Sequence, residues 1–298
     1  MKLFIVVTVY KEKIQNSITV KSIIENNHII RKLFRQVELL IYDNSPVIQN
    51  VEIDLSFPFT SHSDIKNGGL TTAYNYAYEL ARFQFDWIVF LDQDTELNEG
   101  YFKELKKAME KINFNNEVVS IVPKMFHGNK IFSPAQVKWG GIHRSINPKY
   151  TGVYKNGELM AVGSGMALKT SFISSIGGFN KLFWLDCLDR WVFNKIYRMK
   201  KKCYIIPSKI NHELSIMNFE KYMNPKKYSN QIHSEAIFMH RYKTFFENTF
   251  FIVRLIKRAI VLPIQTKNIY YSKESLQIIY SILFSRFTKQ QTFNEYGK

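Results

Sequence analysis

The stretch Trp87-Ile88-Val89-Phe90-Leu91-Asp92-Gln93-Asp94 decides the fold, because an apolar run ends there in two carboxylates. A run of β-branched and aromatic residues bounded by charge predicts a buried strand, whose carboxyl end lies at the rim of a sheet. Asp92 and Asp94 are two residues apart, so in extended backbone both carboxylates lie on the same side. Such a pair can bind a divalent cation directly or through water, or it can be an ordinary acidic turn after a strand.

The residues before this strand predict a parallel βαβ unit. Residues 3–9 form a continuous apolar run, which is typical of a central parallel strand covered on both faces. Residues 11–35 carry apolar side chains at helical spacing, and residues 37–42 predict a second strand that stops at Asp43. Strand, helix and strand in this order indicate a right-handed crossover.

Polar residues gather at one edge of this expected sheet. After a loop with room for a third strand, Asn67-Gly68-Gly69 leads into a helix expected over about 71–83, followed by the opening strand. The pattern indicates a doubly wound α/β half of the nucleotide-binding kind, whose ligands bind beyond the carboxyl ends of the strands. Asp43, Asn67, Asp92 and Asp94 all fall at that edge.

The second half of the chain adds glycine-rich and acidic motifs. Residues 160–168 are apolar and strand-like, and the glycines on either side of Ser164 suggest a bulge or a close approach of the backbone to a ligand. Asp186 and Asp189 follow, at the expected start of a helix that runs to about residue 200. If the helix begins at Asp186, the two carboxylates share one helical face; they can also simply cap the helix.

Composition restricts the class of protein and its surroundings. The 298 residues include 41 Lys and Arg against 25 Asp and Glu, a net charge of +16, which implies an anionic partner such as nucleic acid, acidic lipid or a phosphorylated substrate. Cys187 and Cys203 have neither metal-ligand spacing nor a disulfide framework, which suits a reducing cytoplasm. The N-terminal apolar run is too short for a signal peptide, and the sequence contains no apolar stretch long enough to span a bilayer. We therefore expect a protein that stays inside the cell.

The texture of the sequence changes after residue 218, so we expect domains over 1–218 and 219–298. Residues 221–298 contain 13 Lys and Arg against 4 Asp and Glu. Residues 230–262 and 273–287 show helical spacing, joined by a stretch that contains Pro263. An apolar helical face rimmed by cations favours peripheral attachment to anionic lipid headgroups. The alternative is a helical subdomain packed on the core with solvated cations.

The ordered set of motifs resembles the inverting GT-A glycosyltransferases of family 2, and within them most the bacterial rhamnosyltransferases of surface-polysaccharide assembly. The motifs that carry the resemblance, over residues 1 to about 215, are the strand to Asp43, Asn67-Gly68-Gly69, Asp92-Gln93-Asp94, Gly163-Ser164-Gly165, Gly177-Gly178-Phe179-Asn180, Leu185-Asp186-Cys187-Leu188-Asp189 and Asn211-His212-Glu213. The resemblance implies a Rossmann-like mixed sheet with a C-terminal helical extension. It also implies a nucleoside diphosphate sugar donor, with dTDP-rhamnose favoured and UDP-linked sugars compatible, and a lipid-linked or growing glycan as acceptor.

For the donor, the resemblance implies Mg²⁺ or Mn²⁺ held at the acidic triplet to neutralise the leaving diphosphate. Asp94 is the first candidate for a direct ligand, with Asp92 supporting the metal or the ribose, and His212 completing the metal or diphosphate site. Asp43 is expected to accept a hydrogen bond from the base or ribose. Asn67 with Gly68 is expected to bind the nucleotide, and Ser164 to face the donor or acceptor.

For the acceptor, inversion requires a carboxylate that takes the proton of the attacking hydroxyl. The family commonly places this base in an Asp-x-Glu triplet, and the corresponding residues here are Asp189-Arg190-Trp191. Asp189 is the candidate base, and Asp186 is the alternative base or an acceptor contact. Trp191 departs from the family pattern, which leaves room for a catalytically altered partner subunit.

Two other classes of protein fit less well. A nucleotidyltransferase is expected to have a glycine-rich loop after the first strand, and residues 8–13 contain no glycine. A non-catalytic basic module for nucleic acid or membrane would explain the net charge, but the charge is concentrated beside an aromatic, amphipathic tail, and the sequence shows no nucleic-acid-binding motif. We therefore predict a metal-dependent transferase without a nucleic-acid partner, peripheral on the inner face of the cell membrane.

Overall fold

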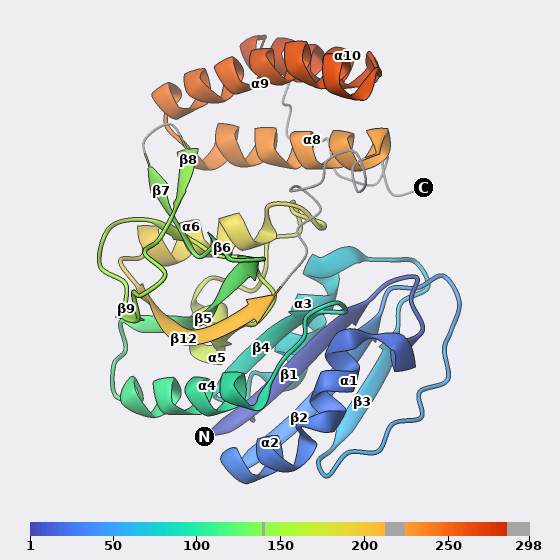
Figure 1. The fold of residues 1–298 in the computed structure, drawn as a ribbon, viewed down its shortest axis with the longest axis vertical. Coiled ribbons are helices and arrows are strands. Elements are labelled where there is room, and N and C mark those ends of the chain that lie inside the picture. Colours follow the sequence, from blue (N-terminus) through green and yellow to red (C-terminus); the bar gives the residue numbers. More distant parts are fainter. Residues whose placement is uncertain (139–140, 212–223, 285–298) are drawn as a thin grey trace. The chain divides into compact units, whose positions relative to one another are not determined.

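The computed structural model describes residues 1–138, 141–211 and 224–284, which fall into two compact units (Figure 1). One unit contains residues 1–136 and 145–212, and the other contains residues 137–144 and 213–298. The chain passes from the first unit to the second within a short strand and returns within the next one.

A nine-stranded sheet forms the centre of the first unit. Its strands are β1 (Lys2–Val9), β2 (Gln36–Asp43), β3 (Phe59–Ser63), β4 (Trp87–Asp92), β5 (Val118–His127), β6 (Lys130–Ser133), β9 (Gly152–Val153), β11 (Met166–Lys169) and β12 (Lys202–Asn211). A second sheet has the order β10-β7-β8, with β7 at Ala135–Lys138, β8 at Ile142–Ser145 and β10 at Leu159–Met160. The helices of the first unit are η1 (Ile14–Asn16), α1 (Ile18–Glu25), α2 (Asn27–Leu33), α3 (Gly69–Ala81), α4 (Glu99–Lys111), α5 (Thr170–Ser175) and α6 (Leu188–Arg198).

The strand order confirms the predicted mixed α/β fold. The larger sheet runs β3-β2-β1-β4-β11-β5-β12-β9, with β6 paired to β5. β1 is parallel to β2 on one side, where Val9 lies opposite Asp43, and to β4 on the other, where Thr8 lies opposite Asp92. Because the chain builds β2 and β3 on one side of β1 and then returns to its other side, the carboxyl ends of β1 and β4 form a topological switch point, where α/β proteins bind ligands.

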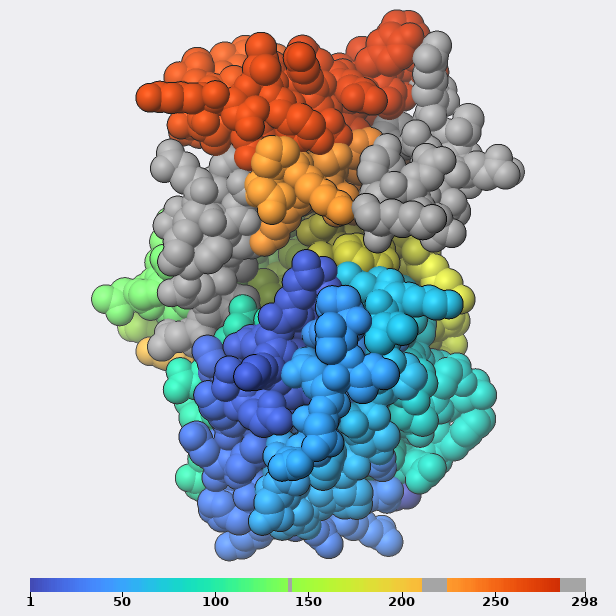
Figure 2. All heavy atoms as spheres, turned by 90° about the vertical axis from the view of Figure 1, so that its right-hand side faces the viewer, coloured from blue at the N-terminus to red at the C-terminus, as the bar shows by residue number. Residues whose placement is uncertain are grey.

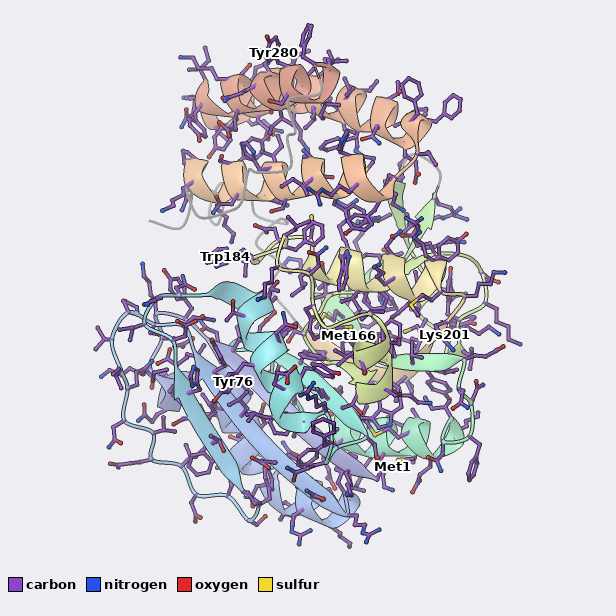
Figure 3. All side chains as sticks on the ribbon, turned by 180° about the vertical axis from the view of Figure 1, so that it is seen from behind. Met1, Tyr76, Met166, Trp184, Lys201 and Tyr280 are labelled. Carbon is purple, nitrogen blue, oxygen red and sulfur yellow. The ribbon has the colours of Figure 1, made fainter. Side chains whose placement is uncertain are left out.

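Helices cover both faces of the sheet, which explains why its central strands are apolar throughout (Figures 1 and 3). On one face, alternate β1 residues such as Leu3 and Ile5 join a core with α1, α2 and α4. On the other face, the ring of Phe90 lies 4.3 Å from that of Tyr74 on α3. This second aromatic layer holds α3 beside the end of β4.

The strand-like run over residues 160–168 is interrupted at its glycines, as expected, but by a turn rather than a bulge. The chain forms β10, a turn over 161–165, and then β11, which pairs antiparallel with β4. Gly165 has φ +77°, a conformation that favours glycine and interrupts the extended backbone. The turn is held by Gly165 N donating to Phe90 O at 2.8 Å and by Met166 N donating to Gly163 O at 3.1 Å.

In its described residues, the second unit contains three helices, α8 (Pro225–Tyr242), α9 (Phe245–Thr266) and α10 (Tyr270–Leu283). α9 and α10 lie side by side on one flank of α8 (Figures 1 and 2). Polar pairs hold the helices together: Arg258 Nη1 lies 2.8 Å from Glu235 Oε2, and Tyr228 Oη lies 2.7 Å from Ser275 Oγ. The carboxylate of Glu235 is mostly buried, so its pairing offsets part of the cost of desolvation.

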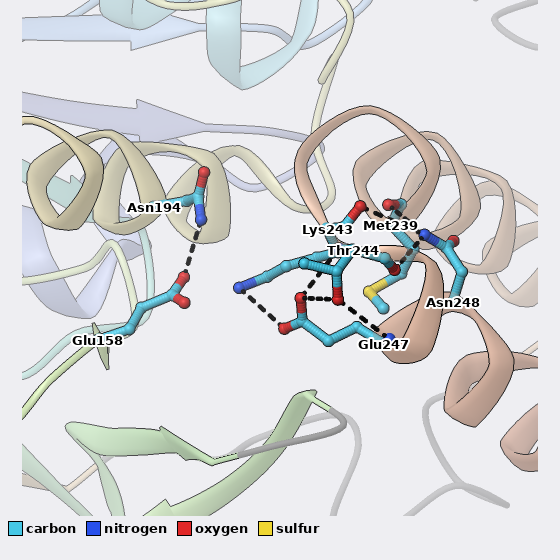
Figure 4. Close-up of polar contacts among 7 residues, drawn as sticks. All are labelled: Glu158, Asn194, Met239, Lys243, Thr244, Glu247 and Asn248. Carbon is cyan, nitrogen blue, oxygen red and sulfur yellow. Dashed lines mark hydrogen bonds and ion pairs between the residues drawn. The ribbon is translucent and has the colours of Figure 1, made fainter.

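The predicted helix boundaries in this region are wrong. The first break falls at residues 243–244 rather than near Pro263, which lies inside α9. A capping box begins α9, in which the Thr244 hydroxyl accepts from Glu247 N and the Glu247 carboxylate accepts from Thr244 N (Figure 4). Thr-x-x-Glu is a sequence signature of a helix start, and it was the signal for this boundary. Lys267, at φ +53°, ends α9.

Candidate donor and acceptor site at the switch point

A cluster of four fully buried hydroxyl residues holds the turn after β4. The hydroxyl cluster consists of Ser17, Thr19, Thr95 and Ser164, each 0% exposed. Thr19 Oγ1 lies 2.5 Å from the carbonyl oxygen of Asp92 and accepts a hydrogen bond from Thr95 N at 2.8 Å. Ser164 Oγ accepts from Asp92 N at 2.9 Å and lies 2.5 Å from Thr95 Oγ1. Hydrogen bonds with these buried hydroxyls therefore hold the backbone of the turn that carries Asp92 and Asp94.

Gln93 ties the same turn to the neighbouring strand. Its side-chain Oε1 accepts from Tyr10 N at 2.7 Å, directly after β1. Its backbone oxygen accepts from Ser17 Oγ at 2.8 Å and from Thr19 N at 3.2 Å. Gln93, which lies between the two acidic residues, thus links the turn after β4 to the segment that follows β1.

Three carboxylates interact at this turn. Burial, followed by the negative charges of Asp94 and Asp189, raises the pKa of Asp92 to about 7. Burial also raises the pKa of Asp189 to about 6, although hydrogen bonds from Arg190 N and Gly163 N oppose the shift. Asp94 is exposed at the edge of the group. Burial and nearby negative charge disfavour the ionised form of Asp92, and a bound cation would offset both effects.

Hydrogen bonds clamp the loop that leads to Asp189 onto α3. Asn75 Nδ2 donates to Phe179 O at 2.9 Å, and Phe179 N donates back to Asn75 Oδ1 at 2.8 Å. Further along, Thr71 N donates to Trp184 O at 3.3 Å, and the Thr71 hydroxyl donates to Phe183 O. The two glycine-rich motifs of the sequence, at residues 67–69 and 177–178, therefore belong to one packing arrangement.

Packing at the start of α3 explains the glycines of the first motif. A Cβ on Gly69 would lie 2.4 Å from Trp184 Nε1, and Gly69 has φ +78°. A Cβ on Gly68 would lie 2.7 Å from Asp64 Oδ2, which accepts from Gly68 N at 2.9 Å. Asn67, at φ +50°, is half-buried and its carbonyl oxygen accepts from Trp184 Nε1 at 3.2 Å. A side chain at either glycine would push Trp184 or Asp64 away.

Asp43 lies at the carboxyl end of β2, as predicted, but it is only 1% exposed. Its Oδ1 accepts from Ser45 N at 2.9 Å, and its Oδ2 accepts from Gln49 Nε2 at 3.0 Å. Gln49 also donates to Glu12 O at 2.8 Å. The carboxylate therefore organises the loop after β2, and each oxygen keeps a second lone pair for a ligand.

The acidic motif after this loop does not begin a helix at Asp186. α6 starts at Leu188, and Cys187 occupies the N-cap position with φ +64° and no side-chain capping hydrogen bond. The condition for Asp186 and Asp189 to share a helical face is therefore not met, because the left-handed Cys187 turns the chain between them. Asp189 is in the first turn of α6, half-buried beside Gly163.

The indole of Trp191 is almost fully buried in α6, with 3% of its surface exposed. Within the described residues its Nε1 has no hydrogen-bond partner, and the Lys195 amine lies 5.7 Å from its ring centroid. Glu158, which is not part of α6, contacts the same helix: its Oε1 accepts a hydrogen bond from Asn194 Nδ2 at 3.0 Å (Figure 4). Glu158 precedes β10, so its proximity to α6 was invisible in the sequence.

His212 lies outside the described residues. Among the residues that are described, no group of three or more His, Cys, Asp or Glu is arranged to hold a metal. A cation at this turn would therefore take Asp92 and Asp94 from the described part of the chain, and further ligands from elsewhere.

Sequence reasoning missed Tyr74, whose hydroxyl faces the carboxylates. The side chain is 2% exposed, and the pKa of its phenol is raised well above its ordinary value by burial and by the charges of Asp92 and Asp189. Asn67 precedes α3 and has a left-handed backbone, so helical spacing from the motif at residues 67–69 does not place Tyr74, and no local signal pointed to it.

Comparison with known proteins identifies the family. The model of the family described as "Glycosyl transferase family 2" matches residues 4–177. This is more than half of the chain, and the chain belongs to glycosyl transferase family 2. It is a glycosyltransferase with the GT-A fold, as the resemblance of its ordered motifs implied.

Solved structures of S. aureus TarS are similar to this chain. One TarS structure has 14% identity and a TM-score of 0.51, covering 96% of this chain and 55% of that one. A structure of TarS residues 1–349 in complex with UDP-GlcNAc has 13% identity and a TM-score of 0.50, covering 97% and 93%. At these identities the similarity concerns the fold. No curated protein sequence matches the chain.

Proposed function

We propose that this glycosyltransferase is metal-dependent and inverting, and that it moves a sugar from a nucleoside diphosphate donor to a hydroxyl of a lipid-linked or growing surface glycan. The observation that carries the proposal is the fixed acidic turn of Asp92 and Asp94 at the switch point of the sheet. The buried hydroxyl cluster preorganises this turn, and preorganised charge is the usual means by which enzymes stabilise a leaving group.

In this proposal Mg²⁺ or Mn²⁺ binds at Asp94 and Asp92, with His212 as a further ligand. The cation supplies Lewis-acid stabilisation of the departing diphosphate. Hydrogen bonds to both its N–H and its carbonyl oxygen hold the backbone of Asp92 in place. Asp43 and the segment Asn67-Gly68 lie at the carboxyl edge of the sheet and are the proposed contacts to the nucleotide.

Asp189 is the proposed general base. Its pKa of about 6 lies close to neutral pH, which suits a group that must accept a proton. Gly163 N and Arg190 N donate to this carboxylate and orient it. Asp186 remains the proposed alternative base or acceptor contact. It lies in the loop before α6 rather than on the same helical face as Asp189.

Two donors are proposed for testing. The Asp-Gln-Asp triplet favours dTDP-rhamnose through its resemblance to rhamnosyltransferases. TarS, whose structure is known with UDP-GlcNAc, supports a UDP-linked sugar instead.

Thermal unfolding of the full chain with Mn²⁺ and dTDP, UDP, GDP or CDP separates these donors, because a bound nucleotide raises the unfolding midpoint. Transfer is then measured with the sugar form of the nucleotide that binds. A folded protein that binds none of the four nucleotides and hydrolyses or transfers no nucleotide sugar contradicts the proposal, and would leave the role of a partner subunit.

The outer face of α9 supports attachment to an anionic membrane surface. The buried residues Phe251, Leu255 and Ala259 face the other helices, yet the exposed face is also apolar. Its exposed apolar side chains recur at helical spacing: Phe246 at 66%, Val253 at 57%, Ile256 at 46%, Ile260 at 61% and Ile264 at 75%. None of the helices in the described part of the chain has the length and apolarity needed to cross a bilayer.

We propose that this face of α9 enters the headgroup region while the basic side chains of the C-terminal region meet acidic lipids. The inner face of the cell membrane is the proposed location, in keeping with two free cysteines. Sedimentation with vesicles that contain about a third phosphatidylglycerol measures this binding. A chain that stays in the supernatant at low salt refutes the membrane proposal and leaves the transferase proposal untouched.

A further inference from the structure

The tyrosine hydroxyl beside the acidic turn has no structural use that the described residues reveal. Tyr74 packs its ring between Phe90, at 4.3 Å, and Phe179, at 5.3 Å, so the ring is fixed on both sides. Its Oη is buried, and no described residue forms a hydrogen bond with it. A buried hydroxyl without a partner is costly, and native proteins keep one mainly where a water or a ligand uses it.

Gly163 leaves a space beside this hydroxyl. A methyl group built on Gly163 would lie 3.6 Å from Tyr74 Oη and 3.9 Å from Asp189 Cβ, both ordinary contact distances. Gly163 is absent from the residues with a left-handed φ, so its backbone does not require glycine. Among the described residues neither packing nor conformation explains the missing side chain, in contrast to Gly68 and Gly69.

The groups around this space are complementary to a sugar hydroxyl. Carboxylates only accept hydrogen bonds, whereas a hydroxyl both donates and accepts one. The phenol of Tyr74 is protonated at neutral pH, since the ordinary pKa of a tyrosine is about 10, and is available as a donor. A hydroxyl placed here can accept from Tyr74 and donate to one of the carboxylates.

We propose that Tyr74 and Gly163 form a subsite for one sugar hydroxyl, in which Tyr74 donates a hydrogen bond to the hydroxyl oxygen and a neighbouring carboxylate accepts a hydrogen bond from that hydroxyl. The inference rests on the proposed glycosyl transfer and names a substrate-binding residue for it. The hydroxyl belongs either to the transferred sugar or to the acceptor, and the two sources give different results.

The experiment compares the full-length wild type with Tyr74→Phe, Gly163→Ala and the control Tyr78→Phe. Tyr78 is one turn further along α3 and is also mostly buried. Binding of UDP, dTDP, UDP-GlcNAc and dTDP-rhamnose is measured by calorimetry with Mn²⁺, and KM is measured with a panel of aryl glycosides as acceptors. Thermal midpoints are recorded for every variant.

For a hydroxyl of the transferred sugar, Tyr74→Phe is expected to weaken binding of the nucleotide sugar about 3- to 10-fold and leave the free nucleotide unchanged. For an acceptor hydroxyl, binding of the nucleotide sugar stays unchanged and the KM for the glycoside rises by the same factor. Gly163→Ala fills the space and gives the same pattern, whereas Tyr78→Phe changes neither. The midpoint of Tyr74→Phe stays at or above that of the wild type, because the lost hydroxyl had no partner in the described fold.

Two results overturn the inference. One is a Tyr74→Phe variant with wild-type binding and KM. The other is a Tyr74→Phe variant that binds free nucleotide and nucleotide sugar more weakly by the same factor and has a lower thermal midpoint, which indicates a purely structural role. If the wild type itself binds no nucleotide, the proposed function fails first and the subsite fails with it.

Discussion

Replacing Ser164 by alanine tests whether the hydroxyl cluster holds the acidic turn. The Ser164 hydroxyl is 0% exposed and has two partners, Asp92 N at 2.9 Å and Thr95 Oγ1 at 2.5 Å. Without it, the Asp92 N–H loses its acceptor, which costs about 1–3 kcal/mol for a buried group. The lost contact to Thr95 adds about 1 kcal/mol. We expect Ser164→Ala to lower the free energy of unfolding by roughly 2–4 kcal/mol.

Urea denaturation measures this loss, with Ser175→Ala as the matched control. Ser175 is exposed at the end of α5, where its hydroxyl donates to Phe172 O at 2.7 Å, so we expect a change below about 0.5 kcal/mol. The double variant Ser164→Ala with Thr95→Val should cost less than the two single changes together, because it removes both members of the hydroxyl pair.

The same variant separates two roles for Ser164. If the hydroxyl contacts donor or acceptor, as the sequence predicts, Ser164→Ala weakens ligand binding and leaves the unfolding free energy close to that of Ser175→Ala. That outcome refutes the support role. A stability loss of several kcal/mol, with nucleotide binding restored at low temperature where the fold is intact, supports it.

The remaining predictions concern the carboxylates and the outer face of α9. Asp94→Ala should abolish the rise in thermal midpoint that Mn²⁺ and nucleotide produce together; a full rise in this variant would remove Asp94 from the metal site. Asp189→Asn should keep nucleotide binding and lose transfer by about 10² or more, the scale of general-base catalysis, and normal transfer would shift the role to another acid. The pKa of Asp92 is raised to about 7 in the folded protein and is about 4 in the unfolded chain. Between these pH values the folded state binds more protons than the unfolded state. The free energy of unfolding of the metal-free protein should therefore fall as the pH rises from about 4 to 7. Asp92→Asn should flatten this pH dependence in denaturation curves, and an unchanged slope would contradict the cause. Replacing Ile260 and Ile264 by serine should weaken vesicle sedimentation tenfold or more, while serine at the exposed Phe114 of the other unit should not; equal effects would argue against the α9 face.

Much of the first half of the fold was readable from the sequence, because each element carries its own local signal. The apolar runs of β1 and β4 are continuous since both faces of the sheet are covered. Asp92 and Asp94 were identifiable as a candidate site because they end such a strand. The order of motifs then pointed to the family, which the match over residues 4–177 confirms.

Boundaries that depend on a single residue were less predictable. Gly165 interrupts the expected strand through its left-handed backbone, and Cys187 adopts the same region although it is not a glycine. Pro263 was expected to separate two helices, but the capping box of Thr244 and Glu247 sets the boundary instead. In each case a local conformation overrode the periodic pattern of apolar residues.

The sequence by itself determined the strand–helix order and the presence of an acidic triplet, because both follow from local hydrophobic pattern and turn chemistry. Only the tertiary structure decided which side chains support that triplet. Ser164 and Thr95 are 69 residues apart, and Tyr74 and Gly163 are even further apart in the chain, so no local pattern connects them. Their proximity arises because β11 returns antiparallel to β4 and α3 packs on the opposite face from α1. The candidate donor-site carboxylates were therefore visible in the sequence, whereas the hydroxyls that hold their turn and the proposed sugar-hydroxyl subsite appeared only when the chain was folded.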